Sequence, residues 1–251
     1  MLASAAPSGV SLRVTAQYVQ IYREKVTCLI SGNDVVLRGG HGHDEQQPQQ
    51  LVGAEEATLS DAAEALAFLR AGETRRAVAA TAMNNRSSRA HTVLVLQLEQ
   101  CRRGTSLRSR LHLVDLAGSE QLKLSKAAGE RAAEAIGING SLSVLGKCIT
   151  SLTEGRRHVP YLESKLTTLL RPALGGNSRT TVVVTGSMED SHAQQTLAAL
   201  RFGETCSLVT NTTRACVTSV KAALVRPIGL VHSRASSSFH HPKRSASFVL
   251  V

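Results

Sequence analysis

The chain has 251 residues, 42% of them hydrophobic and only 3% aromatic, which suits one sizeable core built mainly from Leu, Val, Ile and Ala. No apolar run reaches membrane-spanning length and the first residues lack the pattern of a signal peptide, so we expect a soluble, intracellular protein without a membrane partner. The five cysteines form no C-x-x-C pair, which favours a reducing compartment over a disulfide framework or a zinc site. The formal net charge of +10 indicates a polyanionic partner.

The first fifty residues alternate between short strand patterns and turns. Residues 1–11 are mostly small and include Pro and Gly, so we expect them to be disordered. A β-rich run predicts a strand within 12–22, followed by a turn or short helix that ends near Gly32. Residues 34–38 predict a second short strand. The stretch 39–50 has nothing to bury and predicts a surface loop.

A helix and a β-hairpin come next. Ser60 is the expected N-cap of a helix that Gly72 stops, with a continuation through 73–85. Residues 92–100 and 111–115 are apolar strand patterns joined by a basic turn, so we expect them to pair as an antiparallel hairpin. We expect the second of these strands to be buried on both faces.

The remaining elements alternate between helix and strand. Apolar residues at helical spacing predict a helix that ends at Gly155, and a further helix is expected to restart at Lys165 after Pro160. Residues 180–185 predict another buried strand, and 193–209 a helix. Beyond these elements, the segment 212–251 carries six cations, no acid and no periodicity. We predict that it is a basic, disordered tail.

One motif lies where a buried strand ends. The apolar run that closes at Val114 is followed by Asp115, and Gly118 comes three residues later. An Asp at the carboxyl end of a buried strand can hold Mg²⁺ through water, and a Gly lets a backbone N–H approach a terminal phosphate. By itself, this pattern also fits an Asp that caps a turn.

A second segment upstream makes the pattern specific. Residues 84–91 read Asn-x-x-Ser-Ser-Arg-x-His and residues 115–120 read Asp-Leu-Ala-Gly-Ser-Glu. Together they resemble switch I and switch II of the kinesin motor family. Stretches at 19–25, 138–146 and 158–180 resemble further kinesin motifs in the same order. The resemblance implies a partial kinesin-type P-loop NTPase fold, an α/β architecture with a central sheet flanked by helices on both faces. It runs over residues 12–211 and lacks the first third of a motor domain.

The resemblance implies an ATP and Mg²⁺ site built from the two switches. Ser88 would ligate Mg²⁺ directly and Asp115 through water, while the N–H of Gly118 would sense the γ-phosphate. An ion pair between Arg89 and Glu120 would close over the nucleotide and orient the attacking water. The implied catalytic and nucleotide-contacting positions are Asn84, Ser87, Ser88, Arg89, Asp115, Gly118 and Glu120.

The resemblance also implies microtubules, that is tubulin, as the partner, with a place on the cytoplasmic cytoskeleton and no nucleic-acid partner. The implied contact residues are His158, Tyr161, Lys165 and Arg179. Leu162 and Thr168 stand where the family commonly has Arg, which weakens this expectation.

The sequence contains no G-x-x-x-x-G-K-[ST] motif, which in P-loop proteins cradles the β- and γ-phosphates. We therefore expect the 251-residue chain to bind ATP poorly and not to be catalytic by itself. The family also places a further strand between those at 111–114 and 180–184. Without it, we expect these two strands either to pair directly or to expose their edges, which would make the chain prone to association.

Three functions remain open at this point. The leading hypothesis is a kinesin-like microtubule motor fragment. The second is a non-catalytic microtubule-binding remnant that uses its basic tail. The third is a small Mg²⁺-nucleotide switch protein of another P-loop family, with Asp115 and Gly118 as the shared feature. No pattern in the sequence indicates cargo, direction of movement or oligomeric state.

Overall fold

The protein is described here from a computed structural model that covers residues 10–39, 49–81, 90–102, 105–118, 130–213, 217–219 and 246–250. Within these ranges an eight-stranded sheet runs in the order β2-β1-β6-β7-β10-β8, with β5 paired to β1 and β9 paired to β7. A separate hairpin joins β3 and β4. The strands are β1 (Val10–Tyr22), β2 (Lys25–Cys28), β3 (Val36–Arg38), β4 (Gln50–Val52), β5 (Ala57–Thr58), β6 (His91–Arg102), β7 (Thr105–Asp115), β8 (Ser178–Val182), β9 (Val217–Ser219) and β10 (Ala246–Leu250).

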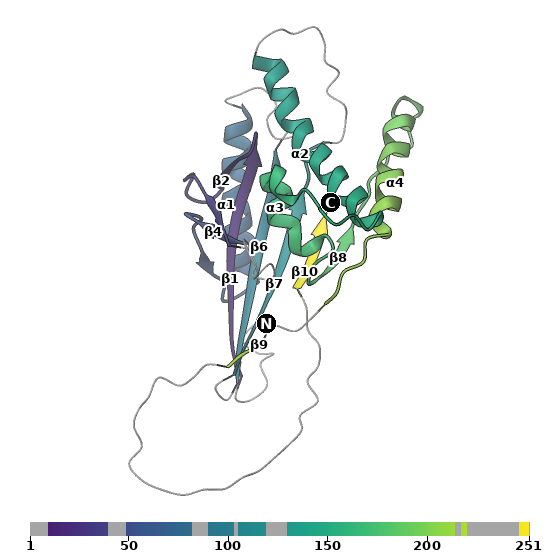
Figure 1. The fold of residues 1–251 in the computed structure, drawn as a ribbon. Coiled ribbons are helices and arrows are strands. Elements are labelled where there is room, and N and C mark those ends of the chain that lie inside the picture. The colour runs from purple at the N-terminus through teal and green to yellow at the C-terminus, as the bar shows by residue number, and fades with distance from the viewer. Residues whose placement is uncertain are drawn as a thin grey trace, which may run out of the picture.

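Helices cover both faces of the sheet (Figure 1). This arrangement confirms the predicted α/β fold class. The α-helices are α1 (Ala62–Thr81), α2 (Glu130–Thr153), α3 (Lys165–Leu170) and α4 (Ala193–Ser207), and short 3-10 helices occupy Tyr161–Glu163, Arg171–Ala173 and Asp190–His192. No helix in the described ranges is both long and apolar enough to cross a membrane.

The main core lies on the face that α2 and α3 cover. Val19, Val93 and Val114 are aligned across β1, β6 and β7, and each is at most 1% exposed. Leu145 of α2 and Leu169 of α3 pack in the same cluster. Because burying a side chain of this size contributes about 1.5–3 kcal/mol, this row of valines ties the two helices to the centre of the sheet.

The opposite face carries a smaller core beneath α1. Tyr18, Leu94 and Phe68 are buried together there. In the same cross-strand row, Leu113 of β7 is 37% exposed. The prediction that the 111–114 strand is buried on both faces is therefore wrong, because α1 packs over β1 and β6.

The predicted β-hairpin is confirmed, since β6 and β7 pair antiparallel with Thr92 opposite Asp115. The predicted end of α2 is also confirmed: Gly155 has φ +64°, a left-handed conformation that suits Gly after a helix. The segment after Glu24 is predicted only in part. Residues 25–28 form β2, which turns back onto β1 through Arg23 and Glu24 at positive φ. The predicted turn follows at 29–31 and ends near Gly32, whose N–H donates to the carbonyl of Cys28 at 2.9 Å.

Helix α1 departs from prediction at its start and at Gly72. Its first turn is capped by Asp61, whose Oδ1 accepts from the N–H of Glu64 at 2.8 Å, while the N–H of Ser60 donates to the Glu64 side chain at 2.7 Å. The predicted N-cap at Ser60 is therefore one residue too early. The predicted stop at Gly72 is wrong: the helix passes through this glycine, which lies against the ring of Tyr18. The predicted continuation beyond Gly72 is confirmed as far as Thr81.

The C-terminal strands depart most from prediction. β8 is not a buried strand, since Val183 just beyond it is 44% exposed. β7 and β8 neither pair directly nor expose both facing edges, because β10 lies between them and runs parallel to both (Figure 1). Residues 217–219 and 246–250, which fall in the segment predicted to be disordered, both form strands.

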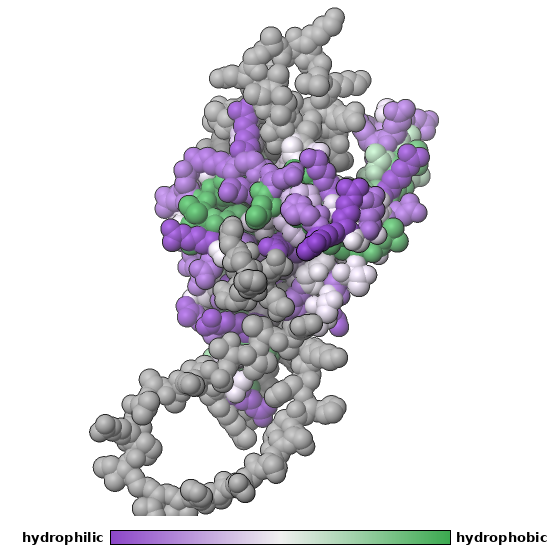
Figure 2. All heavy atoms as spheres, viewed as in Figure 1, coloured by the Kyte–Doolittle hydropathy of each residue, from purple (hydrophilic) through white to green (hydrophobic). Residues whose placement is uncertain are grey.

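Helix α4 presents an apolar surface to solvent. Leu197, Leu200 and Leu208 are each more than half exposed, although their spacing suggested a buried side. Figure 2 shows hydrophobic side chains gathered over α4 at the right of the molecule. The contacts of this region with the core come instead from Phe202, Cys206 and Val209.

Two glycines in α-helices provide a test of this packing. A Cβ at position 72 would lie 2.7 Å from Cε1 of Tyr18, so we expect Gly72→Ala to lower the free energy of unfolding by about 1–3 kcal/mol. A Cβ at Gly146 in α2 would meet nothing within 4 Å, so Gly146→Ala should raise the free energy of unfolding by up to about 1 kcal/mol. Urea denaturation measures both. Equal changes of the same sign would contradict the placement of Gly72 against Tyr18.

Candidate functional site

Asp115 is held at the carboxyl end of β7 by an arginine from α1. Nη2 of Arg76 lies 3.0 Å from Oδ2 of Asp115. The Arg76 side chain is only 19% exposed, whereas that of Asp115 is 49% exposed. The carboxylate therefore faces solvent at the edge of the sheet while the partly buried guanidinium fixes its orientation.

Arg76 belongs to a chain of polar contacts that reaches β1. Its Nη1 lies 3.6 Å from Oε2 of Glu73, and the hydroxyl of Tyr18 donates to the other oxygen of Glu73. Burial, and the Glu73 carboxylate beside it, raise the pKa of Tyr18 to about 12, so the phenol keeps its proton. The contacts connect β1, α1 and β7. Of these four residues, only Asp115 was predicted from the sequence as a site residue. Glu73 and Arg76 lie three residues apart on one helix, and this spacing is the sequence signal that could have indicated their contact.

His91 is the last residue of the motif at 84–91, and it contacts both the motif at 115–120 and helix α2. It is 2% exposed; its Nδ1 accepts from the N–H of Ala117 at 2.9 Å, and its Nε2 lies 2.8 Å from Oγ of Ser141. Because a backbone N–H can only donate, Nδ1 carries no proton, and Nε2 is the donor to Ser141. Burial lowers the pKa of His91 to about 4, so the ring is neutral at pH 7.

The connection between α2 and α3 is anchored by Tyr161. Its hydroxyl donates to the carbonyl of Leu174 at 2.5 Å, and its own carbonyl accepts from Oγ1 of Thr167 at 2.7 Å. The guanidinium of Arg171 lies 5.3 Å from the ring centroid, within cation–π range. Tyr161 therefore fixes the conformation of the α2–α3 connection, whereas His158, three residues earlier, is exposed.

Glu24 caps α3 from the turn between β1 and β2. Oε1 of Glu24 accepts from Oγ of Ser164 at 2.9 Å, and Oε2 accepts from the N–H of Lys165 at 2.5 Å. A carboxylate at a helix start satisfies free N–H groups and complements the helix dipole. It fixes the backbone of Lys165 while leaving that residue exposed to solvent.

The comparisons with known proteins decide the family. The model of the kinesin motor domain matches residues 2–209, most of the chain. The chain belongs to the kinesin motor-domain family. This result confirms the resemblance inferred from the switch I and switch II motifs.

Individual kinesins match at moderate identity. Kinesin-like protein 3 of Schizosaccharomyces pombe is 42% identical over 208 residues, which is 82% of this chain and 37% of that protein. Chromosome-associated kinesin KIF4 of Mus musculus is 37% identical over 210 residues, 81% of this chain and 17% of that protein. The chain thus spans well under half the length of either relative.

Two solved kinesin structures share the fold. A fast kinesin, studied for its ATPase mechanism and its interactions with microtubules, superposes with a TM-score of 0.79 at 35% identity and covers 91% of this chain and 65% of its own. KIF14 as a dimer with AMP-PNP in complex with a microtubule gives a TM-score of 0.74 at 32% identity, over 85% of this chain and 63% of its own.

The structure places only some of the predicted kinesin residues. Asp115 and Gly118 lie at the carboxyl end of β7 as expected. The other predicted nucleotide-site residues lie outside the described residues, so their roles stay predictions: Asn84, Ser87, Ser88, Arg89 and Glu120.

The predicted microtubule-contacting residues are only partly brought together. His158 and Tyr161 lie in the α2–α3 connection, and Lys165 is the first residue of α3 that follows it. Arg179 lies at the start of β8, and no hydrogen bond or ion pair in the described part of the chain joins it to the other three.

The described residues supply only part of a metal site. Asp115 has the right ligand chemistry for Mg²⁺, but one of its oxygens already accepts a hydrogen bond from Arg76. Among the described residues, no group of three His, Cys, Asp or Glu is arranged to hold a metal ion. The fit to Mg²⁺ therefore rests on Asp115 alone within the described ranges.

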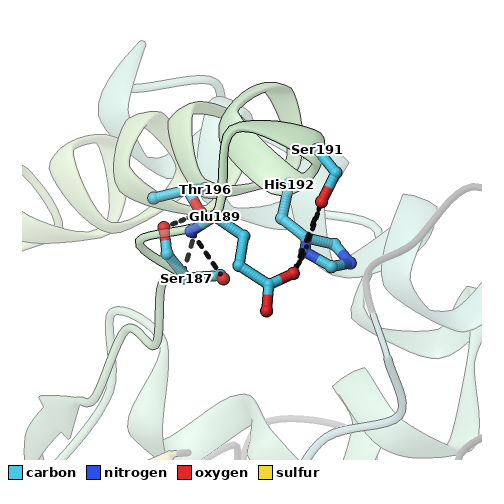
Figure 3. Close-up of polar contacts among 5 residues, drawn as sticks. All are labelled: Ser187, Glu189, Ser191, His192 and Thr196. Carbon is cyan, nitrogen blue, oxygen red and sulfur yellow. Dashed lines mark hydrogen bonds and ion pairs between the residues drawn. The ribbon is translucent and has the colours of Figure 1, made fainter.

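A second polar cluster resembles a Ser–His–carboxylate arrangement but has the wrong geometry (Figure 3). Oγ of Ser191 lies 3.2 Å from Nδ1 of His192, and Oε2 of Glu189 lies 3.2 Å from the same nitrogen. A proton relay needs the hydroxyl and the carboxylate on opposite ring nitrogens. The contacts instead order the turn before α4, together with the N–H of Ser187, which donates to Oγ1 of Thr196 at 3.0 Å.

Burial of His91 predicts an acid-sensitive fold. Its pKa of about 4 lies below the ordinary value of 6.5, so the unfolded chain binds more protons between these values and stability falls as pH drops below 6.5. His112, with a pKa lowered to about 3 by burial and by Arg110, acts in the same direction. The expected loss is about 1.4 kcal/mol per pH unit for each such histidine.

Urea denaturation at pH 7, 6 and 5 measures this slope. His91→Gln should remove the contribution of one histidine from the slope, while His158→Ala, at an exposed site, should leave the slope unchanged. An unfolding free energy that stays constant from pH 7 to pH 5 would contradict the buried, neutral state of His91.

Proposed function

We propose that the chain is a kinesin-like microtubule motor fragment that binds microtubules through the surface formed by α2, α3 and their connection. The observation that carries this proposal is the charge of that surface. Residues 147–171 contain five cations and two acids. An acidic polymer such as tubulin is attracted to such a surface, both in long-range steering and in the final contact.

The two acids of this surface are already paired with cations. Nζ of Lys147 lies 3.3 Å from Glu163, and Nε of Arg156 lies 2.5 Å from Glu154. Arg157 and Lys165 are exposed, and the side chain of neither makes an ion pair within the described ranges. These two cations are the ones we assign to direct contact with tubulin.

The rigid base of this surface supports the proposal. Glu24 fixes the start of α3 and Tyr161 fixes the connection before it, so Lys165 projects from an ordered backbone. A preorganised contact loses less conformational entropy on binding than a mobile one. His158 would then lie at the rim of the contact.

ATP and Mg²⁺ are the cofactors that kinesin motors use, and we assign Asp115 and Gly118 to that site. When bound, Mg²⁺ neutralises charge on the transferred phosphate. Asp115 would face the ion through water, and Arg76 would hold its carboxylate in place. The 251 residues contain no P-loop sequence, so we propose that this chain does not turn over ATP by itself.

The proposed location is the microtubule cytoskeleton of the cytoplasm. One of the relatives is named a chromosome-associated kinesin, so the site within the cell depends on more than the motor domain. The alternative is a non-catalytic microtubule-binding role through the basic tail, which carries six cations and no acid from residue 212 onward.

Co-sedimentation with microtubules tests the binding surface. Arg157→Glu with Lys165→Glu should weaken binding roughly tenfold, or about 1.4 kcal/mol. The matched control is Arg70→Glu with Arg75→Glu on α1, which changes the net charge equally on the opposite face of the sheet and should change binding little. Equal losses from both pairs would contradict a defined surface.

Substitutions that remove only charge separate the contribution of the tail to microtubule binding from that of the α2–α3 surface. Replacing Lys221, Arg226, Arg234, Lys243 and Arg244 with Gln keeps the chain length and removes most of the tail's charge. A loss here that exceeds the loss from the α2–α3 variant, and that disappears as salt rises, would favour the alternative function.

The purified 251-residue chain should show no microtubule-stimulated release of phosphate from ATP, because it lacks a P-loop sequence. A coupled phosphate assay with and without microtubules measures this. The prediction would be overturned by Mg²⁺-dependent turnover that is saturable in ATP and disappears in Gly118→Ala.

A further inference from the structure

The position of β10 in the sheet is the starting observation. β10 runs parallel to β7 on one side, with Ser247 opposite Leu111 and Leu250 opposite Val114. It runs parallel to β8 on the other, with Ala246 opposite Ser178 and Leu250 opposite Val182 (Figure 1). Within the described residues, β8 pairs with no other strand. The connection of β8 to the rest of the sheet therefore depends on five residues from the far end of the sequence.

Both strands beside β10 contain residues that are buried when β10 is in place. Val114 of β7 is 1% exposed, His112 is 4% exposed, and Ser178 of β8 is fully buried. A buried backbone N–H or C=O that loses its partner costs about 1–3 kcal/mol, so an empty gap here would be unfavourable. A strand in this gap pairs with both sides at once.

The sequence of β10 suits such a position. It reads Ala-Ser-Phe-Val-Leu, with no charge and no Pro or Gly, although the rest of the segment from residue 212 is basic. Neutral, apolar runs are typical of strands that are central in parallel sheets. The sequence changes from basic to uncharged and largely apolar after Lys243 and Arg244, so β10 is a distinct short segment within the tail.

We propose that the gap between β7 and β8, called here the β7–β8 slot, is a strand-acceptor site and that residues 246–250 of this chain are its occupant. The segment binds by strand addition, in which backbone hydrogen bonds supply the affinity and alternate side chains supply the specificity. By filling the slot, it holds β8 against the rest of the molecule and removes two edges at which other chains could pair.

The slot also determines which strand can lie beside Asp115. Leu250 is opposite Val114, so the carboxyl end of β10 reaches the end of the sheet at which Asp115 lies. In α/β sheets, phosphate-binding loops follow the carboxyl ends of parallel strands. A strand that brings such a loop beside Asp115 from another segment or another chain can enter only by displacing β10. The tail strand is therefore a competitor for the position from which a nucleotide site would be completed.

The experiment uses the folded, full-length chain. A specific protease site is placed between residues 232 and 240, and the protein is cleaved after folding. We expect the released C-terminal fragment to co-elute with the body of the protein in native gel filtration and to separate in urea. Val249→Pro, which removes one backbone donor in the slot, should release the fragment, whereas Ala235→Pro, outside the described strands, should not.

A second measurement uses a synthetic peptide, Ala-Ser-Phe-Val-Leu-Val, with a fluorescent label. It should bind the chain lacking residues 246–251 at least tenfold more tightly than the intact chain, and a scrambled peptide should bind neither. The truncated chain should elute as larger species and return to the monomer position when the peptide is added. Dissociation of the cleaved wild-type fragment in native buffer at micromolar concentration, or equal peptide affinity for the intact and truncated chains, would overturn the proposal.

Discussion

The pairing of peptide groups in the middle of the sheet is the constraint on which the structure depends. The core row of Val19, Val93 and Val114 places β1, β6 and β7 beneath α2 and α3, and these strands pair through one continuous antiparallel ladder. The ladder would end at β7, which carries Asp115 at its carboxyl end. β10 pairs with the far edge of β7 and continues the sheet into β8. The geometry of the candidate site thus depends on how the sheet is completed.

The same sheet connects the residues that we propose for the nucleotide site to those that we propose for microtubule contact. His91 lies where β6 begins and contacts both Ala117 after β7 and Ser141 in α2, so it connects the ends of β6 and β7 to α2. At its other end α2 leads to Tyr161 and to α3, where Lys165 is exposed. The polar chain from Tyr18 to Asp115 connects the opposite face.

Sequence patterns predicted the local elements well and the long-range ones poorly. The hairpin of β6 and β7 and the end of α2 at Gly155 follow from alternation and glycine chemistry within short windows. Gly72 was misjudged because its role depends on Tyr18, more than fifty residues away. β10 could not be predicted from periodicity, since it is five residues long and pairs with strands far away in the sequence. For the candidate site, the sequence predicted that Asp115 and Gly118 follow a strand, as they do, while their role in a nucleotide site stays a prediction. The partner of Asp115, Arg76, came from a helix with no motif.

Amide hydrogen exchange on the intact chain and on a chain lacking residues 246–251 tests the central claim most directly. If β10 completes the sheet, amides of 111–114 and 178–182 exchange slowly in the intact chain, and those of β8 lose most of their protection in the truncated one. The amides at the β1–β6 interface keep their protection in both, because their ladder does not involve β10. Rapid exchange of β8 amides in the intact chain, or identical protection of β8 in both chains, would contradict the account.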